Sequence, residues 1–149
     1  MKTQNGTFSL DDFLPYKLSL ASQSVSRLIA QEYENKFGLS MTQWRVLVII
    51  CNSAPLTANE ICDKTLFEKM AISRAVKHLR AREMIDSRPA KNDGRKRILS
   101  ATKLGQQIYN DVLPVAQSYE TTLLSSISDS EKTLLNSTLN KLLLKTKSM

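Results

Sequence analysis

The chain has 149 residues, of which 42% are apolar and 23% charged, and its formal net charge is +7 at pH 7. This length predicts one domain, or one compact body with an appended element, that folds without disulfides or a structural metal. Two cysteines and one histidine leave little scope for a metal or nucleophile site, and few glycines, prolines and aromatics disfavour a many-stranded β fold. We therefore expect neither an enzyme nor a cofactor-dependent or metal-binding protein, and the basic balance favours an acidic partner.

The N-terminus lacks the apolar core of a signal peptide. The longest apolar run, 46–51, is far shorter than the ~20 residues that a membrane span requires. We expect a cytoplasmic protein with reduced thiols and no membrane association.

The first two predicted elements are helices. Apolar side chains recur every three or four residues over 13–37, and Gly38 follows where a left-handed, helix-terminating residue belongs. Ser40 and Gln43 then form a capping-box pattern at the start of a second helix, which ends before Pro55.

The middle of the chain has the order of a winged helix-turn-helix. A capping-box pattern at Thr57 and Glu60 opens a short third helix, and a longer helix is predicted over 68–82. Two short extended runs, 84–88 and 97–101, flank a polar stretch and predict a β-hairpin. The apolar side of the longer helix consists of Ile72, Ala75, Val76 and Leu79. A short helix, a turn and a longer helix form a helix-turn-helix, and the hairpin directly after it makes the motif winged.

Two further helices complete the chain. Thr102 opens a long helix that contains Pro114, and we expect a kink there because proline lacks a backbone donor and crowds the preceding turn. Ser128 and Glu131 form a third capping-box pattern before a leucine-rich last helix. The predicted fold is therefore mainly α with a small β-hairpin wing.

Positive charge is concentrated on the predicted winged motif. Residues 64–103 include twelve basic and four acidic residues, a net charge of +8, so the rest of the chain carries −1. A run of charge is most often a solvated face, but its coincidence with a helix-turn-helix and a hairpin is typical of a nucleic-acid-binding surface.

The polar side of the 68–82 helix carries the candidate DNA contacts. Ser73, Arg74 and Lys77 point away from its apolar side, where they can reach phosphates or base edges. Lys69 adds positive charge near the helix N-terminus, which itself attracts phosphate. His78 lies toward the edge of this side, and as a lone histidine it is predicted to be a surface or DNA-side donor rather than a metal ligand.

Three stretches occur in a specific order. Residues 93–105 contain Asp-x-Arg, then a leucine four residues after the arginine, and then Thr-x-x-Gly. Two other stretches precede them in the chain: 72–79 in the predicted 68–82 helix, and 37–47 around the start of the second helix. In this order the chain resembles the MarR family of winged-helix transcriptional regulators, whose wing, recognition helix and second helix these stretches match. The resemblance covers the chain from about residue 13 to the last leucines.

The resemblance implies a homodimer whose helical dimerisation region is formed by 1–38 and 103–149, with 39–102 as the winged DNA-binding domain. It implies a pseudo-palindromic operator in double-stranded DNA and a regulator expected to act as a repressor. Each recognition helix would enter a major groove and each wing a minor groove. Arg95 would insert into the minor groove, whose negative potential attracts arginine, with Asp93 orienting it. Lys96 and Arg97 would add charge, and turn formation by Asp93 and Gly94 alone is the alternative.

Two positions depart from the family pattern. Glu83 stands just after the recognition helix, where the family often has glycine, and costs around 1 kcal/mol if the backbone there is left-handed. Gly94 stands where many relatives carry arginine, which weakens the charge of the wing.

Family members commonly release DNA when a small aromatic or anionic effector binds. Candidate lining residues for such a pocket are Phe13, Tyr16, Lys17 and Trp44. The alternative for Phe13 and Trp44 is an ordinary place in the core or an interface.

Two other functions stay open. Some relatives respond to cysteine oxidation, for which Cys51 and Cys62 are the candidates, although free cysteines are usually small buried apolar residues. A winged helix that binds protein instead of DNA would need an apolar or acidic recognition face, whereas this one carries Arg74 and Lys77.

Overall fold

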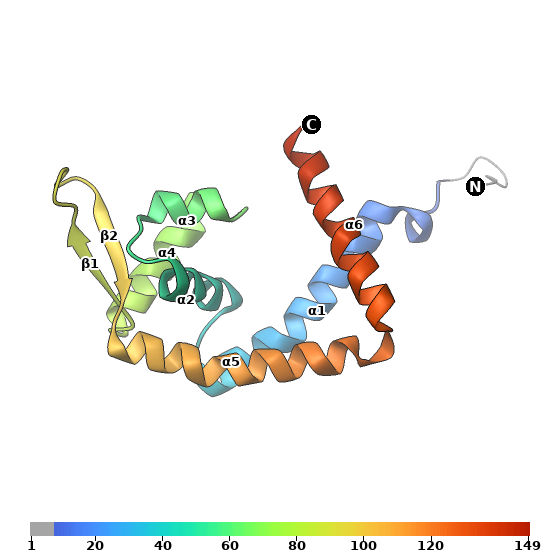
Figure 1. Ribbon diagram of the computed structural model, residues 1–149, viewed down its shortest axis with the longest axis horizontal. Coiled ribbons are helices and arrows are strands. Elements are labelled where there is room, and N and C mark those ends of the chain that lie inside the picture. Colours follow the sequence, from blue (N-terminus) through green and yellow to red (C-terminus); the bar gives the residue numbers. More distant parts are fainter. Residues whose placement is uncertain (1–7) are drawn as a thin grey trace. The chain divides into compact units, whose positions relative to one another are not determined.

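The computed structural model describes residues 8–149. In chain order its elements are the 3-10 turn η1 (Leu10–Asp12), helices α1 (Leu14–Phe37), α2 (Met41–Ser53), α3 (Ala58–Lys64) and α4 (Lys69–Ala81), strands β1 (Ile85–Pro89) and β2 (Arg97–Ala101), helix α5 (Lys103–Leu123), the 3-10 turn η2 (Leu124–Ser126) and helix α6 (Asp129–Lys147) (Figure 1). The predicted fold, mainly helical with one antiparallel hairpin, is confirmed. None of the described helices is long and apolar enough to cross a membrane.

The chain divides into two compact units, Met1–Val112 and Leu113–Met149. The division lies inside α5, next to Pro114, through which the helix continues. The first unit contains the winged helix-turn-helix, and the second contains the end of α5 and all of α6. The expected functional division, into a dimerisation region and a DNA-binding domain, stays a prediction.

Local capping groups set the ends of the helices as predicted. At the start of α2 the hydroxyl of Ser40 accepts a hydrogen bond from the backbone N–H of Gln43 over 3.2 Å. The amide oxygen of Gln43 accepts one in return from the backbone of Ser40 over 3.0 Å. The predicted capping boxes at the starts of α3 and α6 are also present. Gly38 ends α1 in the left-handed conformation, at φ 62°.

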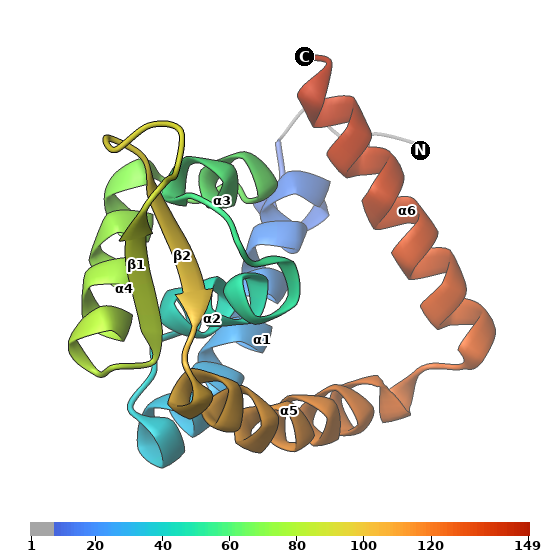
Figure 2. The same ribbon diagram turned by 60° about the vertical axis from the view of Figure 1, so that its left-hand side comes forward.

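The core of the first unit is formed by α2, α3, α4 and the hairpin. In Figure 2, β1 lies beside α4, and β2 lies on the side of α2 and α3, with which it makes contacts. Residues of these elements that are almost fully buried include Leu47, Ile50, Ile61, Ile72, Leu79 and Leu99. Of the four residues predicted on the apolar side of α4, Val76 is only half-buried and the other three are buried.

Strand β2 is bonded on both of its edges. On one edge it pairs antiparallel with β1, in a register that sets Ile85 opposite Ala101 and Pro89 opposite Arg97. On the other edge Leu99 and Leu56, from the connection between α2 and α3, exchange backbone hydrogen bonds of 2.8 and 3.4 Å. The base of the wing is therefore fixed to the helical core.

The passage from α4 to the wing explains the Thr-x-x-Gly motif. The backbone of Glu83 is in the left-handed conformation, at φ 58°. This is the strained conformation considered for this position, where relatives often have glycine. The hydroxyl of Thr102 donates to the carbonyl of Glu83 over 2.7 Å, and its backbone N–H donates to that of Met84 over 3.1 Å. A Cβ on Gly105 would lie 1.9 Å from the carbonyl oxygen of Met84, so only glycine fits at this position.

Candidate nucleic-acid interface

Helix α4 divides into a buried side and a cationic side. Ile72, Ala75 and Leu79 are buried, whereas the predicted contact residues Lys69, Ser73, Arg74 and Lys77 are exposed. Within 39–102 no basic side chain lies within ion-pair distance of a carboxylate, since the ion pairs of the described residues lie in α1 and α6. The charges of α4 are therefore available to an external polyanion.

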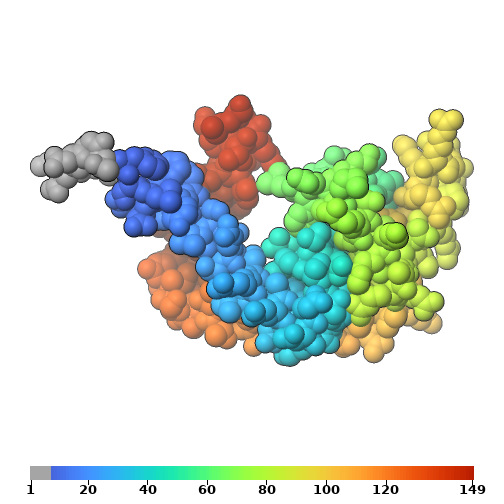
Figure 3. Space-filling view, turned by 180° about the vertical axis from the view of Figure 1, so that it is seen from behind, coloured from blue at the N-terminus to red at the C-terminus, as the bar shows by residue number. Residues whose placement is uncertain are grey.

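The wing loop places a second group of cations at the end of the hairpin. The carboxylate of Asp93 accepts from the backbone N–H of Arg95 over 3.0 Å, and the carbonyl of Asp93 accepts from that of Lys96, also over 3.0 Å. Asp93 thus shapes the backbone of the turn, and the side chains of Arg95 and Lys96 are exposed. In the space-filling view the hairpin tip extends beyond α3 and α4 (Figure 3).

Arg97 differs from the other two wing cations. Its Nε donates to the hydroxyl of Ser87 over 3.0 Å and its Nη2 to the carbonyl of Ser87 over 2.7 Å. These bonds hold its guanidinium across the hairpin against β1. The cation stays exposed but has a fixed place, which a sequence pattern of consecutive basic residues does not predict.

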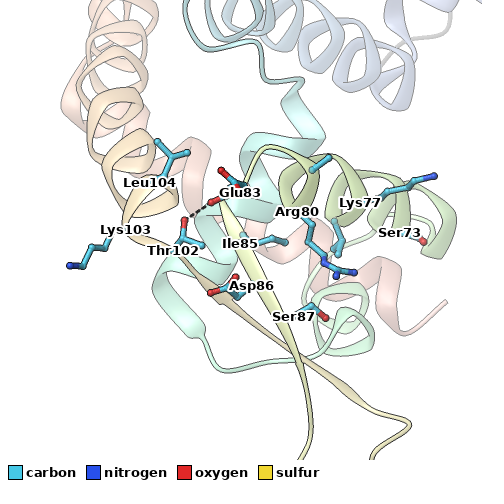
Figure 4. Close-up of a pocket in the computed structure, with 12 residues that line it drawn as sticks. Ser73, Lys77, Arg80, Glu83, Ile85, Asp86, Ser87, Thr102, Lys103 and Leu104 are labelled. Atoms are coloured by element: carbon cyan, nitrogen blue, oxygen red, sulfur yellow. Dashed lines mark hydrogen bonds between the residues drawn. The ribbon is translucent and has the colours of Figure 1, made fainter.

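A groove of about 910 Å³ lies between α4, β1 and the start of α5 (Figure 4). Its cationic lining residues are Lys77, Arg80 and Lys103. Glu83 and Asp86 contribute carboxylates to the same lining. The groove therefore adjoins the cationic side of α4, with which it shares Ser73 and Lys77.

His78 lies at the edge of the cationic side of α4. The residue is only partly exposed, and its Nε2 is buried without a hydrogen-bond partner. That nitrogen points into the protein because His78 lies at the border of the two sides of α4.

Sequence reasoning missed a structural role for Arg82. Its guanidinium donates to the carbonyl of Gly38 over 2.8 Å and to that of Phe37 over 2.9 Å, at the C-terminal end of α1. In the sequence Arg82 is one of twelve basic residues in 64–103. No local sequence pattern predicts its contact with Gly38, which lies 44 residues earlier.

Comparison with known proteins agrees with this geometry. A MarR family model matches residues 37–96. Over 110 residues the chain is 27% identical to the HTH-type transcriptional regulator YwoH of Bacillus subtilis strain 168, a match covering 72% of this chain and 80% of that protein. The crystal structure of a MarR/EmrR family regulator from Acinetobacter sp. ADP1 is similar with a TM-score of 0.87 and 26% identity, over 95% of this chain and 100% of that one. Over residues 37–96, the winged-helix part of the chain, this protein is similar to the MarR family.

The proteins from Bacillus subtilis and Acinetobacter are both named as transcriptional regulators. A complex of S. aureus MepR with DNA shares the fold, with a TM-score of 0.81 and 20% identity over 89% of this chain and 98% of that one. The fold expected from the MarR resemblance is thereby confirmed.

The four residues suggested for an effector pocket have different environments in the structure. Trp44 is only 7% exposed, with its ring 5.5 Å from that of Tyr33 and stacked 5.9 Å from that of Tyr109. Trp44 is thus a core residue, which was the alternative for it. Phe13 and Lys17 are exposed and Tyr16 is half-buried on the first turn of α1.

The two thiols are free and half-buried. Burial raises the pKa of Cys51 to about 11, so the thiol is protonated at neutral pH. Since the thiolate is the reactive species, this environment disfavours Cys51 as the sensor of a redox-responsive regulator.

Proposed function

We propose that this protein is a homodimeric, sequence-specific DNA-binding transcriptional regulator of the MarR family that acts as a repressor. Helix α4 enters the major groove of a pseudo-palindromic operator, and the wing reaches the adjacent minor groove. Its predicted cytoplasmic location belongs to the same proposal. The observation that carries it is the pair of exposed cationic groups on α4 and on the wing tip, none of whose members forms an ion pair with another described residue.

Each group suits one groove. The B-DNA major groove, ~12 Å wide, admits a helix, and Arg74 and Lys77 can reach its base edges or the flanking phosphates. The exposed side chain of Arg95 is suited to a narrow minor groove, where the negative potential is enhanced. Lys69 and Lys96 add phosphate contacts, which strengthen binding without reading sequence.

The exposed leucines support a dimer. Helix α6 has no buried residue, although Leu134, Leu135, Leu139, Leu143 and Leu144 are large, apolar and 38–68% exposed. Leu14, Leu18 and Leu28 of α1 are also exposed. A second copy of the chain is the partner we propose for these apolar surfaces.

The proposal is tested by DNA binding of charge variants. Arg74→Ala and Arg95→Ala are compared with Arg27→Ala, which removes an exposed cation from α1. Operator duplexes are first selected from a random-sequence pool, and affinity is measured by fluorescence anisotropy from 50 to 200 mM salt. We expect each of the first two variants to lose roughly 5- to 150-fold in affinity, and a lost phosphate contact to reduce the salt slope by about 1. Full affinity of both variants at physiological salt would contradict the proposal.

Release by a small aromatic or anionic effector is a further part of the proposal. The groove beside α4 carries Lys77, Arg80 and Lys103, so an anion bound there competes with DNA phosphate for the same cations. Adding benzoate to the preformed complex tests this. Benzoate-dependent release that Arg80→Ala abolishes is the expected result, and equal release from both proteins would argue against the groove.

A further inference from the structure

Two large apolar side chains are exposed on the winged-helix part of the molecule. Met70, in the first turn of α4, is 63% exposed, and Leu66, in the turn between α3 and α4, is 88% exposed. Within 39–102 they are the only exposed large apolar residues; the others lie before or in α1, in α5 and α6, and at the C-terminus. The others thus fall within 1–38 and 103–149, the proposed dimerisation region, which does not include Met70 and Leu66, here called the apolar pair.

Met70 lies at the middle of the cationic side of α4. At about 100° per residue it is ~180° around the helix from the buried Leu79. On the same scale Ser73, Arg74 and Lys77 all lie within about 60° of it. Met70 is thus surrounded by the residues proposed to contact DNA, in the first turn of the helix, and it is the N-terminal residues of a recognition helix that contact base edges.

The chemistry of the major groove restricts what an apolar side chain can contact there. All four bases present hydrogen-bond donors or acceptors in the major groove. Thymine also presents its C5-methyl group, which is apolar. Single exposed apolar residues are common on protein surfaces, but Met70 lies on a side of α4 that is otherwise polar and cationic. The surrounding cations favour a polyanion, which distinguishes this place from a docking site for an apolar protein surface.

We infer that the apolar pair reads thymine in the operator, with Met70 packing on a thymine methyl group in the major groove and Leu66 beside it. This inference rests on the proposed function and adds a base preference to it. The half-site contains A·T pairs opposite the start of α4, next to positions contacted by Arg74 and Lys77. Met70 is then a specificity-determining residue that contributes no charge.

Replacing thymidine by deoxyuridine tests the inference directly, because it removes only the methyl group and keeps base pairing. The duplex selected from a random pool is made with thymidine and with deoxyuridine at each position in turn. Affinities are measured for the wild type, Met70→Ala, Met70→Leu and Leu66→Ala. Lys77→Ala is the control, since it weakens binding through a polar contact and leaves the methyl contact in place.

We expect the wild type to lose about fourfold for each contacted methyl group that is removed. Met70→Ala should bind the thymidine duplex and the duplex with deoxyuridine at the Met70 position with equal affinity. Met70→Leu should retain part of the preference for thymidine. Lys77→Ala should retain the full preference while binding both duplexes more weakly. Leu66→Ala loses discrimination at the neighbouring thymine.

The outcomes separate this inference from the proposed function. If a sequence is enriched but the wild type binds the thymidine and deoxyuridine duplexes equally, the thymine contact is wrong and the DNA-binding function stands. The same holds if Met70→Ala keeps the wild-type discrimination, or changes only the oligomeric state. If no sequence is enriched, the proposed sequence-specific function fails and the inference fails with it.

Discussion

The guanidinium of Arg82 donates a hydrogen bond to the carbonyl oxygen of Gly38 over 2.8 Å, although 44 residues separate them in the chain. Gly38 is the left-handed cap of α1, and Arg82 is the residue at which α4 ends. Arg82 places a positive charge at the C-terminus of α1, where unpaired carbonyls concentrate negative charge. The bond ties the end of the proposed recognition helix to the end of a proposed dimerisation helix.

Replacing Arg82 by alanine should lower the free energy of unfolding. The change removes two charge-assisted hydrogen bonds, and a loss of about 1–3 kcal/mol is expected because the site is only partly buried. Urea denaturation measures the loss. Arg80→Ala is the matched control, since Arg80 is exposed and lies two residues earlier in the chain. Equal stability of the two variants would show that the contact contributes nothing.

Replacing Glu83 by glycine should stabilise the fold. Glu83 is at φ 58°, which glycine adopts without a steric penalty, and a gain of about 0.5–1 kcal/mol is expected. The carbonyl that accepts from Thr102 belongs to the backbone and is retained. Glu83→Ala keeps a Cβ and should bring no such gain. A thermal melt that shows the same shift for both variants would point to the lost charge as the cause.

Gly105→Ala should destabilise the protein by at least about 2 kcal/mol. The new Cβ would meet the carbonyl oxygen of Met84 at 1.9 Å, and backbone atoms cannot move aside as a flexible side chain can. Gly94→Ala serves as the comparison, because nothing lies within 4 Å of its added Cβ, and its stability should stay within about 0.5 kcal/mol of wild type. A well-folded Gly105→Ala protein would mean that α5 can shift away from Met84 at little cost.

Cys51 should react slowly with alkylating reagents below pH 9. With its pKa raised from 9.0 to about 11, its thiolate fraction at pH 8 is on the order of 100-fold below that of the unfolded chain. The Cys62→Ser variant isolates Cys51, and iodoacetamide labelling in buffer and in denaturant gives the two rates. Similar labelling rates in buffer and in denaturant would contradict the raised pKa of Cys51, and with it the argument against redox sensing by this thiol.

The same shift sets a pH dependence of stability. Because the folded-state pKa of Cys51 lies above its ordinary value, its contribution to folding is present below pH 9.0 and is lost as the pH rises toward about 11. Unfolding free energies of the Cys62→Ser protein with and without Cys51→Ala should therefore diverge in their pH dependence within that range.

The sequence predicts the parts of this fold that depend on near neighbours. Ser40 and Gln43 bond each other across three residues, so their identities alone predict the start of α2. The hairpin is predicted equally well, because its strands and turn are contiguous. The cationic side of α4 follows from helical periodicity, and Arg74 and Lys77 are exposed as expected.

Features that depend on distant contacts could not be predicted in the same way. Trp44 is predicted as a pocket residue, and only the fold shows that the ring of Tyr109, from α5, stacks on it. Arg82 and Arg95 are both arginines in one basic segment, and only the fold shows that the first is bonded to α1 while the second is exposed. Met70 was missed for a different reason, since a search for DNA contacts among charged residues passes over an apolar one.

Strand β2 is hydrogen-bonded on both edges, and this limits which parts of the wing can change in length without disturbing the rest of the domain. Leu99 is fixed by Leu56 as well as by β1, so the base of the hairpin keeps its place whatever the loop beyond Pro89 contains. Insertions or deletions between 90 and 96 would then alter the reach of the wing without tilting the recognition helix. A change in this loop would then alter the proposed minor-groove contact alone and leave the proposed major-groove contact of α4 unchanged.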